Sequence, residues 1–76
     1  MKITKTRISG LVIIEPKVFD DSRGYFFEPY NKEDFDNKFG ITNFLQDNES
    51  KSVKGVLRGI HFQKPPLAQA KLVRCI

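Results

Sequence analysis

The single histidine of this chain, His61, lies in a segment whose charged side chains are all positive. Residues 51–76 contain six Lys or Arg and no Asp or Glu, and Arg58 and Lys71 lie on either side of the histidine. Histidine titrates near neutral pH and is the usual general base, while Arg and Lys bind oxyanions and phosphates. The segment therefore predicts proton removal next to a carbonyl. A purely structural histidine is the alternative interpretation.

A pair of amide side chains forms a second candidate group. In "TNFLQDNES", residues 42–50, alternation would place Phe44, Gln46 and Asn48 on one face of a strand. A buried polar pair needs hydrogen-bonding partners, so Gln46 and Asn48 favour the wall of a pocket over a core.

The elements that must position these residues are short strands and one helix. Asn31 can cap the helix and Gly40 can end it. Short strands at this spacing with one helix indicate a mainly β sandwich or barrel. The expected segments are a strand over 11–19 near a sheet edge, a turn over 20–24, a strand over 25–30, a helix over 31–40, strands over 42–50 and 54–63, a Pro-rich loop over 64–68 and a strand over 69–76.

The strand over 54–63 raises a question of geometry. Arg58 and His61 are an odd number of residues apart, so strict alternation would point them to opposite sides. Gly59 between them could host a bulge that re-aims one of the two. A glycine that marks close packing is the alternative.

Length and composition bound the possible functions. With 76 residues the chain forms one small domain at most, and domains of this size are marginally stable alone. One cysteine, Cys75, and one histidine are too few for a disulfide or a zinc site, so we expect a partner chain or further sequence. No membrane-spanning run or signal peptide is visible, which predicts a soluble, cytoplasmic protein. The net charge of +4 fits nucleic acid poorly, because no recognition motif accompanies it.

Two motifs in this order resemble a known family. "GVLRGIHFQKPPLAQAKLVRC" is similar to the signature of dTDP-4-dehydrorhamnose 3,5-epimerases, and "DDSRGYFFE" resembles their N-terminal substrate-contact segment, with "QDNES" between them. The resemblance covers essentially all of residues 1–76, as the N-terminal portion of a single cupin-like epimerase domain. It implies a cupin-type jelly roll, incomplete in this chain, with one short helix near 32–39. It also implies a homodimer or higher homo-oligomer, a dTDP-sugar substrate, and no metal or other cofactor.

The resemblance also implies a role for each candidate residue. His61 resembles the catalytic base that removes protons from the carbons flanking the C4 ketone, and Lys71 the residue near the developing enolate. Arg58 resembles a ligand of the diphosphate or sugar. The positions similar to nucleotide-contacting ones are Gln46 and Asn48, and, reaching across the dimer to the neighbouring subunit, Arg23, Phe26 and Glu28.

Each of these residues also has an ordinary structural interpretation. Arg23 and Glu28 could be solvated surface charges, and Phe26 could be a core residue. Lys71 could extend along an apolar face with its amine in water. Cys75 is expected to be an inert core thiol.

The chain departs from the family in length. Full members are more than twice as long, and their second half supplies a tyrosine that acts as general acid and an aspartate that orients the histidine. Neither has a counterpart here. Two functions therefore stand as hypotheses: an epimerase or its N-terminal portion, and a non-catalytic sugar-nucleotide binding or assembly module of the same fold. A small basic nucleic-acid binder is the third interpretation.

Overall fold

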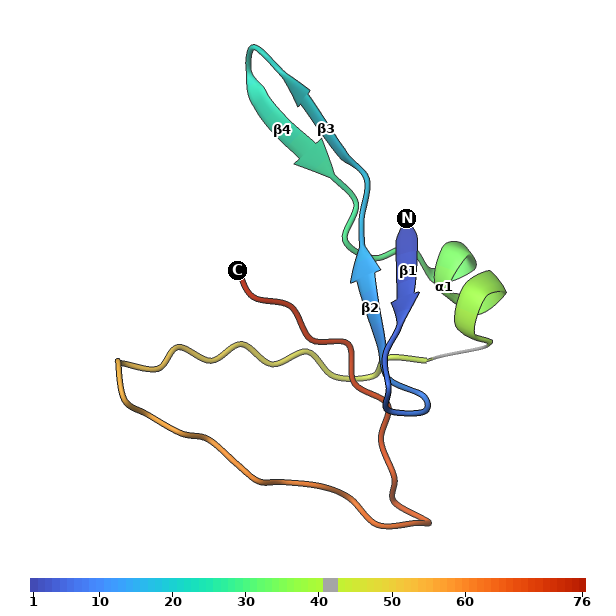
Figure 1. The fold of residues 1–76 in the computed structure, drawn as a ribbon, viewed down its shortest axis with the longest axis vertical. Helices are drawn as coiled ribbons and strands as arrows, with labels where there is room; N and C mark the ends of the chain where they lie inside the picture. The colour runs from blue at the N-terminus through green and yellow to red at the C-terminus, as the bar shows by residue number, and fades with distance from the viewer. Residues whose placement is uncertain (41–42) are drawn as a thin grey trace.

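The computed structural model describes residues 1–40 and 43–76, and its regular elements all lie before residue 40. Two small antiparallel sheets of two strands each are followed by one helix, so the chain is mainly β with one short helix (Figure 1). The elements are β1 (Lys2–Lys5), β2 (Val12–Glu15), β3 (Val18–Asp21), β4 (Gly24–Phe27) and α1 (Lys32–Phe39).

Strands β1 and β2 form the first hairpin, in which Lys2 lies opposite Glu15 and Lys5 opposite Val12. The ammonium of Lys2 lies 3.3 Å from the carboxylate of Glu15. Thr6 organises the connecting loop, because its hydroxyl donates to the carbonyl of Leu11 at 2.9 Å and accepts from the N–H of Ile8 at 3.1 Å. The sequence interpretation did not include β1, whose residues KITK are too polar to show a clear strand pattern.

The predicted strand over 11–19 is two strands in the structure, β2 and β3, which belong to different sheets. The chain leaves one sheet at Pro16, because proline has no N–H to donate to a ladder. The second hairpin then pairs Val18 with Phe27 and Asp21 with Gly24 across a two-residue turn. Gly24 has a φ of 126°, a conformation that side-chain-bearing residues rarely adopt. The turn expected over 20–24 is therefore present but narrower, at residues 22 and 23, because Asp20, Asp21 and Gly24 pair in the ladder.

Helix α1 begins and ends as the sequence predicts. The side-chain oxygen of Asn31 accepts from the N–H of Asp34 at 3.1 Å and so satisfies a donor of the first turn. Gly40 ends the helix with a φ of 82°, and its N–H donates to the carbonyl of Asp36 at 2.9 Å. Lys32 and Asp36 form an ion pair one turn apart on the exposed face.

An aromatic cluster packs the helix against the residues on either side of it. Phe35 is 4% exposed and is the one buried apolar side chain among the residues that the structure describes. Its ring centroid lies 4.8 Å from that of Tyr30 and 5.4 Å from that of Phe39, and Tyr30 meets Phe44 edge to face at 5.6 Å. These spacings are typical of favourable aromatic pairs.

The chain after the helix is open. Residues 43–76 contain no helix or strand and every one of them is exposed, and in Figure 1 they trace a wide yellow-to-red loop that turns back toward the first hairpin. The radius of gyration is 15.2 Å, against about 11 Å for a compact domain of this length. The strands predicted over 42–50, 54–63 and 69–76 are therefore wrong for the described part of these segments; Thr42 lies outside it.

A strand needs a second backbone to pair with, and these segments find none among the residues described. Between residues 51 and 76 the backbone hydrogen bonds are those of turns, such as Val56 N–H to Val53 O at 3.3 Å and Leu67 N–H to Lys64 O at 2.8 Å. The second of these lies in the Pro-rich loop, which is a turn as expected. With no strand at Gly59 there is no bulge there either. The cupin-type jelly roll stays a prediction.

Within the described ranges, no helix has the length and apolar character needed to cross a bilayer. The cytoplasmic location expected from the sequence stays a prediction.

Candidate active site

Three of the predicted site residues lie on or next to the second hairpin. Arg23 occupies the turn between β3 and β4 and pairs with Asp21, with its Nη2 2.6 Å from a carboxylate oxygen. Phe26 lies in β4 opposite Phe19 and is 68% exposed, so it is not a core residue in this structure. Glu28 follows β4 and is also exposed.

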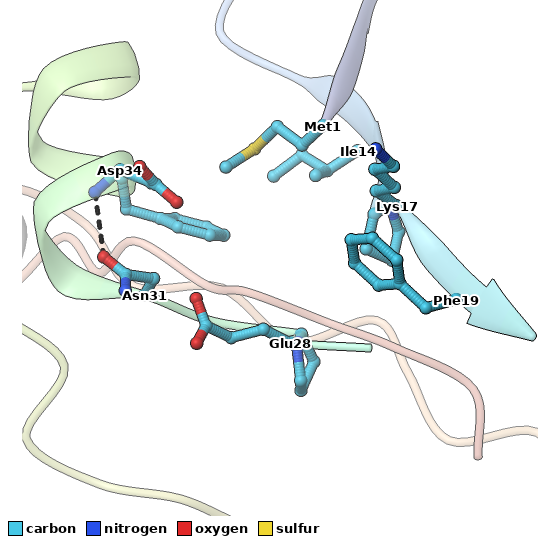
Figure 2. A pocket seen from close by; sticks show the side chains of 10 residues that line it. Met1, Ile14, Lys17, Phe19, Glu28, Asn31 and Asp34 are labelled. Atoms are coloured by element: carbon cyan, nitrogen blue, oxygen red, sulfur yellow. Dashed lines mark hydrogen bonds between the residues drawn. The ribbon is translucent and has the colours of Figure 1, made fainter. Parts of the chain in front are cut away.

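Two hollows flank this hairpin. Arg23 and Phe26 line the one that runs along β3 and β4. The other, of about 190 Å³, lies between the start of the hairpin and helix α1 and is lined by Glu28 together with Lys17 and Phe35. Figure 2 shows the carboxylate of Glu28 on the helix side of this hollow, below the capping Asn31, with Lys17 and Phe19 on the opposite side. The ammonium of Lys17 lies 4.9 Å from the ring centroid of Phe19, within the range of a cation–π contact.

The two amides lie together. The side-chain amide of Gln46 donates to the side-chain oxygen of Asn48 at 3.0 Å, so the two side chains meet although the strand whose face they were predicted to share is not formed. Both are exposed and neither lines the two hollows described above. Their role in nucleotide binding stays a prediction.

Arg58 is held by its own segment. Its Nε donates to the hydroxyl of Ser52 at 2.7 Å and its Nη2 to the carbonyl of Lys51 at 3.1 Å. These two contacts orient the guanidinium without a carboxylate, which leaves its positive charge unneutralised by an ion pair in the described part of the chain.

His61 and Lys71 are exposed, and no residue described by the structure forms a hydrogen bond or ion pair with either of them. The structure therefore brings together Arg23 with Phe26 and Gln46 with Asn48, but it does not gather the basic segment around His61. The catalytic roles of His61 and Lys71 stay predictions.

The described ranges contain no group of three or more His, Cys, Asp or Glu placed to hold a metal ion. Cys75, expected in a core, is exposed as a free thiol. One residue that the sequence interpretation placed only in the turn, and not among the site residues, is Asp21, which binds the backbone and the side chain of Arg23. The spacing of the two residues indicates this contact in the sequence, because an Asp two positions before an Arg in a turn can accept from the backbone N–H of that Arg.

The fold and these residues define a mainly β protein with an arginine-bearing hairpin and a basic segment that contains its histidine. The family model described as dTDP-4-dehydrorhamnose 3,5-epimerase matches residues 5–76. The chain therefore belongs to this family, as the two motifs in the sequence predicted.

Curated proteins named dTDP-4-dehydrorhamnose 3,5-epimerase are similar to the chain over nearly all its length. The protein from Shigella flexneri is 53% identical over 77 residues, which cover 100% of this chain and 42% of the relative. The one from Salmonella typhimurium is 55% identical over 76 residues, with 99% and 42% covered. The one from Methanothermobacter thermautotrophicus is 51% identical over 75 residues, with 99% and 40% covered.

The chain thus spans about two fifths of the length of the curated relatives it matches. No solved structure matches it significantly.

Proposed function

We propose that the intact protein epimerises the carbons flanking the C4 ketone of a dTDP-4-keto-6-deoxyhexose, in the synthesis of dTDP-rhamnose. The observation that carries this proposal is the match over residues 5–76 to the dTDP-4-dehydrorhamnose 3,5-epimerase family, with relatives of that name about half identical to the chain. The reaction is an isomerisation, so it consumes no oxidant or reductant.

The proposed base is the imidazole of His61. It takes a proton from a carbon next to the ketone, and the electron pair of that C–H bond moves into an enolate. The ammonium of Lys71 stabilises the negative charge on the enolate oxygen. A proton delivered to the opposite face of the same carbon completes the inversion and restores the ketone.

The nucleotide end of the substrate is proposed to lie on the other predicted residues. Arg58 has a charged guanidinium already oriented by Ser52 and Lys51, which supports a role in binding the diphosphate. The amides of Gln46 and Asn48 supply hydrogen-bonding groups for the nucleotide. On the hairpin, Arg23 and Phe26 line one hollow and offer a cation and an exposed ring.

We propose that the protein works as a homodimer or higher homo-oligomer. Large apolar side chains are exposed over the hairpin and over residues 43–76, among them Phe26 at 68%, Phe62 at 70% and Ile60 at 95%. A surface of this character is typical of a face covered in an assembly.

The second candidate function is a sugar-nucleotide binding or assembly module that does not turn over. Two observations favour it for the 76 residues alone. No described carboxylate contacts His61 to orient its ring, and the chain spans about two fifths of the curated relatives.

Solvent exchange separates the two functions. The keto-sugar nucleotide is incubated with the protein in D₂O, and NMR follows deuterium entering the carbons next to the ketone. An epimerase incorporates deuterium and forms inverted product, whereas a binding module does neither although it binds the nucleotide. His61→Asn should lower the exchange rate by about 100- to 10,000-fold and leave binding of thymidine diphosphate nearly unchanged.

Lys54→Gln is the control, because Lys54 is an exposed cation of the same basic segment with no proposed role. Undiminished exchange in His61→Asn would make the histidine structural. No exchange with the unmodified protein, despite nucleotide binding, would favour the binding module.

A further inference from the structure

At the end of β3, next to the turn of the second hairpin, the carboxylate of Asp21 binds Arg23 at three of its N–H groups. Asp21 accepts from the backbone N–H of Arg23 at 2.8 Å and from its Nη2 at 2.6 Å. The Nε of Arg23 lies 3.3 and 3.2 Å from the two oxygens of the same carboxylate. Asp21 therefore fixes both the backbone of the turn and the direction of the guanidinium.

The arginine keeps part of its hydrogen-bonding capacity. A guanidinium presents five N–H donors in a planar fork, and Asp21 occupies the edge formed by Nε and Nη2. The edge formed by Nη1 and Nη2 retains N–H groups that can donate to a phosphate in a bidentate manner. The side chain of Arg23 is 88% exposed, so this edge is open to a ligand.

Stability of the fold is a weak explanation for this pair. Exposed ion pairs contribute little, because solvent screens them and two flexible side chains must be ordered. Orientation is a better one, because ordering a long side chain in advance lowers the entropy lost when a ligand binds. The pairing lowers the pKa of the Asp21 carboxyl through its hydrogen bonds from Arg23, so the carboxylate stays ionised at neutral pH.

The position of the pair indicates what it would bind. Arg23 lines the same hollow as Phe26, which follows Tyr25 in β4 and has an exposed ring. A cation with a free donor edge beside an exposed aromatic ring suits a ligand that has both a phosphate and a flat base.

We propose that Asp21 is a positioning residue that holds the guanidinium of Arg23 ready for a phosphate of a nucleoside diphosphate. The identity of this ligand rests on the proposed function. The opposite role is a carboxylate that competes with the phosphate for Arg23, and it predicts a change of affinity in the other direction.

Asp21→Asn tests the proposal in the intact protein expressed from its own gene. The asparagine oxygen can still accept from the N–H of Arg23 and so keep the turn, while the charged, bidentate contact to the guanidinium is lost. Asp20→Asn is the matched control. It removes the same negative charge from the lining of the same hollow, but Asp20 forms no ion pair with Arg23 in the structure. Calorimetry with thymidine diphosphate measures binding, and NMR measures hydrogen exchange at the Nε–H of Arg23.

For Asp21→Asn we expect faster Nε–H exchange and a Kd for thymidine diphosphate raised about 3- to 10-fold. In the epimerase assay KM should rise while kcat changes little, since the phosphate contact is remote from the reacting carbons. Asp20→Asn should leave Nε–H exchange unchanged and should not weaken binding of thymidine diphosphate, because it removes a negative charge from the hollow without removing a contact to Arg23. A cross-strand NMR contact between Phe19 and Phe26 verifies that the hairpin is intact in each variant.

The outcomes separate cleanly. Unchanged exchange or unchanged affinity in Asp21→Asn overturns the positioning role, and tighter binding assigns Asp21 the competing role instead. These failures appear only in the variant. Failure of the proposed function appears in the unmodified protein, as an absence of thymidine diphosphate binding, and would overturn the nucleotide assignment with it.

Discussion

Replacing Phe35 by alanine should remove much of the packing that joins helix α1 to the rest of the chain. Phe35 is 4% exposed and contacts the rings of Tyr30 and Phe39. Deleting a buried phenylalanine side chain typically costs about 3–5 kcal/mol of stability. The surrounding rings are partly exposed, Tyr30 and Phe39 each at 37% and Phe44 at 38%, so they can move into the vacated space. We therefore expect a loss near the lower end, about 3 kcal/mol.

A loss of that size is large for this chain. A folded domain of its length has a free energy of unfolding of about 4–11 kcal/mol, so Phe35→Ala should lower the urea midpoint strongly. Circular dichroism in urea measures the midpoint, and the slope against urea should be unchanged if the denatured state is unaffected. Because Phe35 also lines the hollow that contains Glu28, the NMR signals around Glu28 should shift as well.

Ile8→Ala is the control. It also truncates a large apolar side chain, but Ile8 is 57% exposed in the loop of the first hairpin and lies outside the apolar surface proposed for assembly. Its replacement should change the free energy of unfolding by less than about 0.5 kcal/mol. Equal shifts of the urea midpoint in the two variants would refute the assignment of Phe35 as the centre of the packed region.

Two further predictions concern binding and assembly. Arg58→Lys should weaken binding of thymidine diphosphate about 10-fold in calorimetry and leave binding of thymidine unchanged, because lysine lacks the planar fork of donors. Arg74→Lys is the control. Unchanged binding of thymidine diphosphate by Arg58→Lys would contradict the diphosphate role. The 76-residue chain should sediment as an associated species at micromolar concentration, because its exposed apolar surface favours contact between chains; a folded monomer there would contradict the proposed assembly.

The features that the sequence predicted correctly are the ones encoded by neighbouring residues. Asn31 caps the helix three residues before Asp34, and Gly40 closes it four residues after Asp36. The turn before Gly24 follows from residues only two positions apart. Each of these depends on backbone geometry and short-range hydrogen bonds, so no knowledge of the distant chain was needed.

The strands predicted after the helix are wrong because strand formation depends on distant residues as well as on neighbouring ones. Alternation in residues 54–63 and 69–76 reports which side chains would face a core, but a strand also needs a neighbouring backbone for its hydrogen bonds. The apolar run over 11–19 shows the same limit of sequence patterns. It forms two strands that belong to different sheets, and the chain passes from one sheet to the other at Pro16. The pairing of Asp21 with Arg23 was readable from spacing, but its use in orienting the guanidinium needed coordinates.

The site residues differ in what fixes them, and this bears on how a site could form. Arg23 is fixed by a residue two positions away and Arg58 by residues six and seven positions away, so both cations that are proposed to bind phosphate are oriented by local contacts. His61 has no such contact among the described residues. A base must be held within hydrogen-bonding reach of the proton it removes. Its placement therefore depends on contacts from outside its own segment, whereas Arg23 and Arg58 are already oriented by contacts within theirs. For the proposed function, nucleotide binding then depends on local contacts and epimerisation on distant ones. Substitutions that remove distant contacts of residues 59–76 should therefore abolish exchange at the sugar carbons before they abolish binding of thymidine diphosphate.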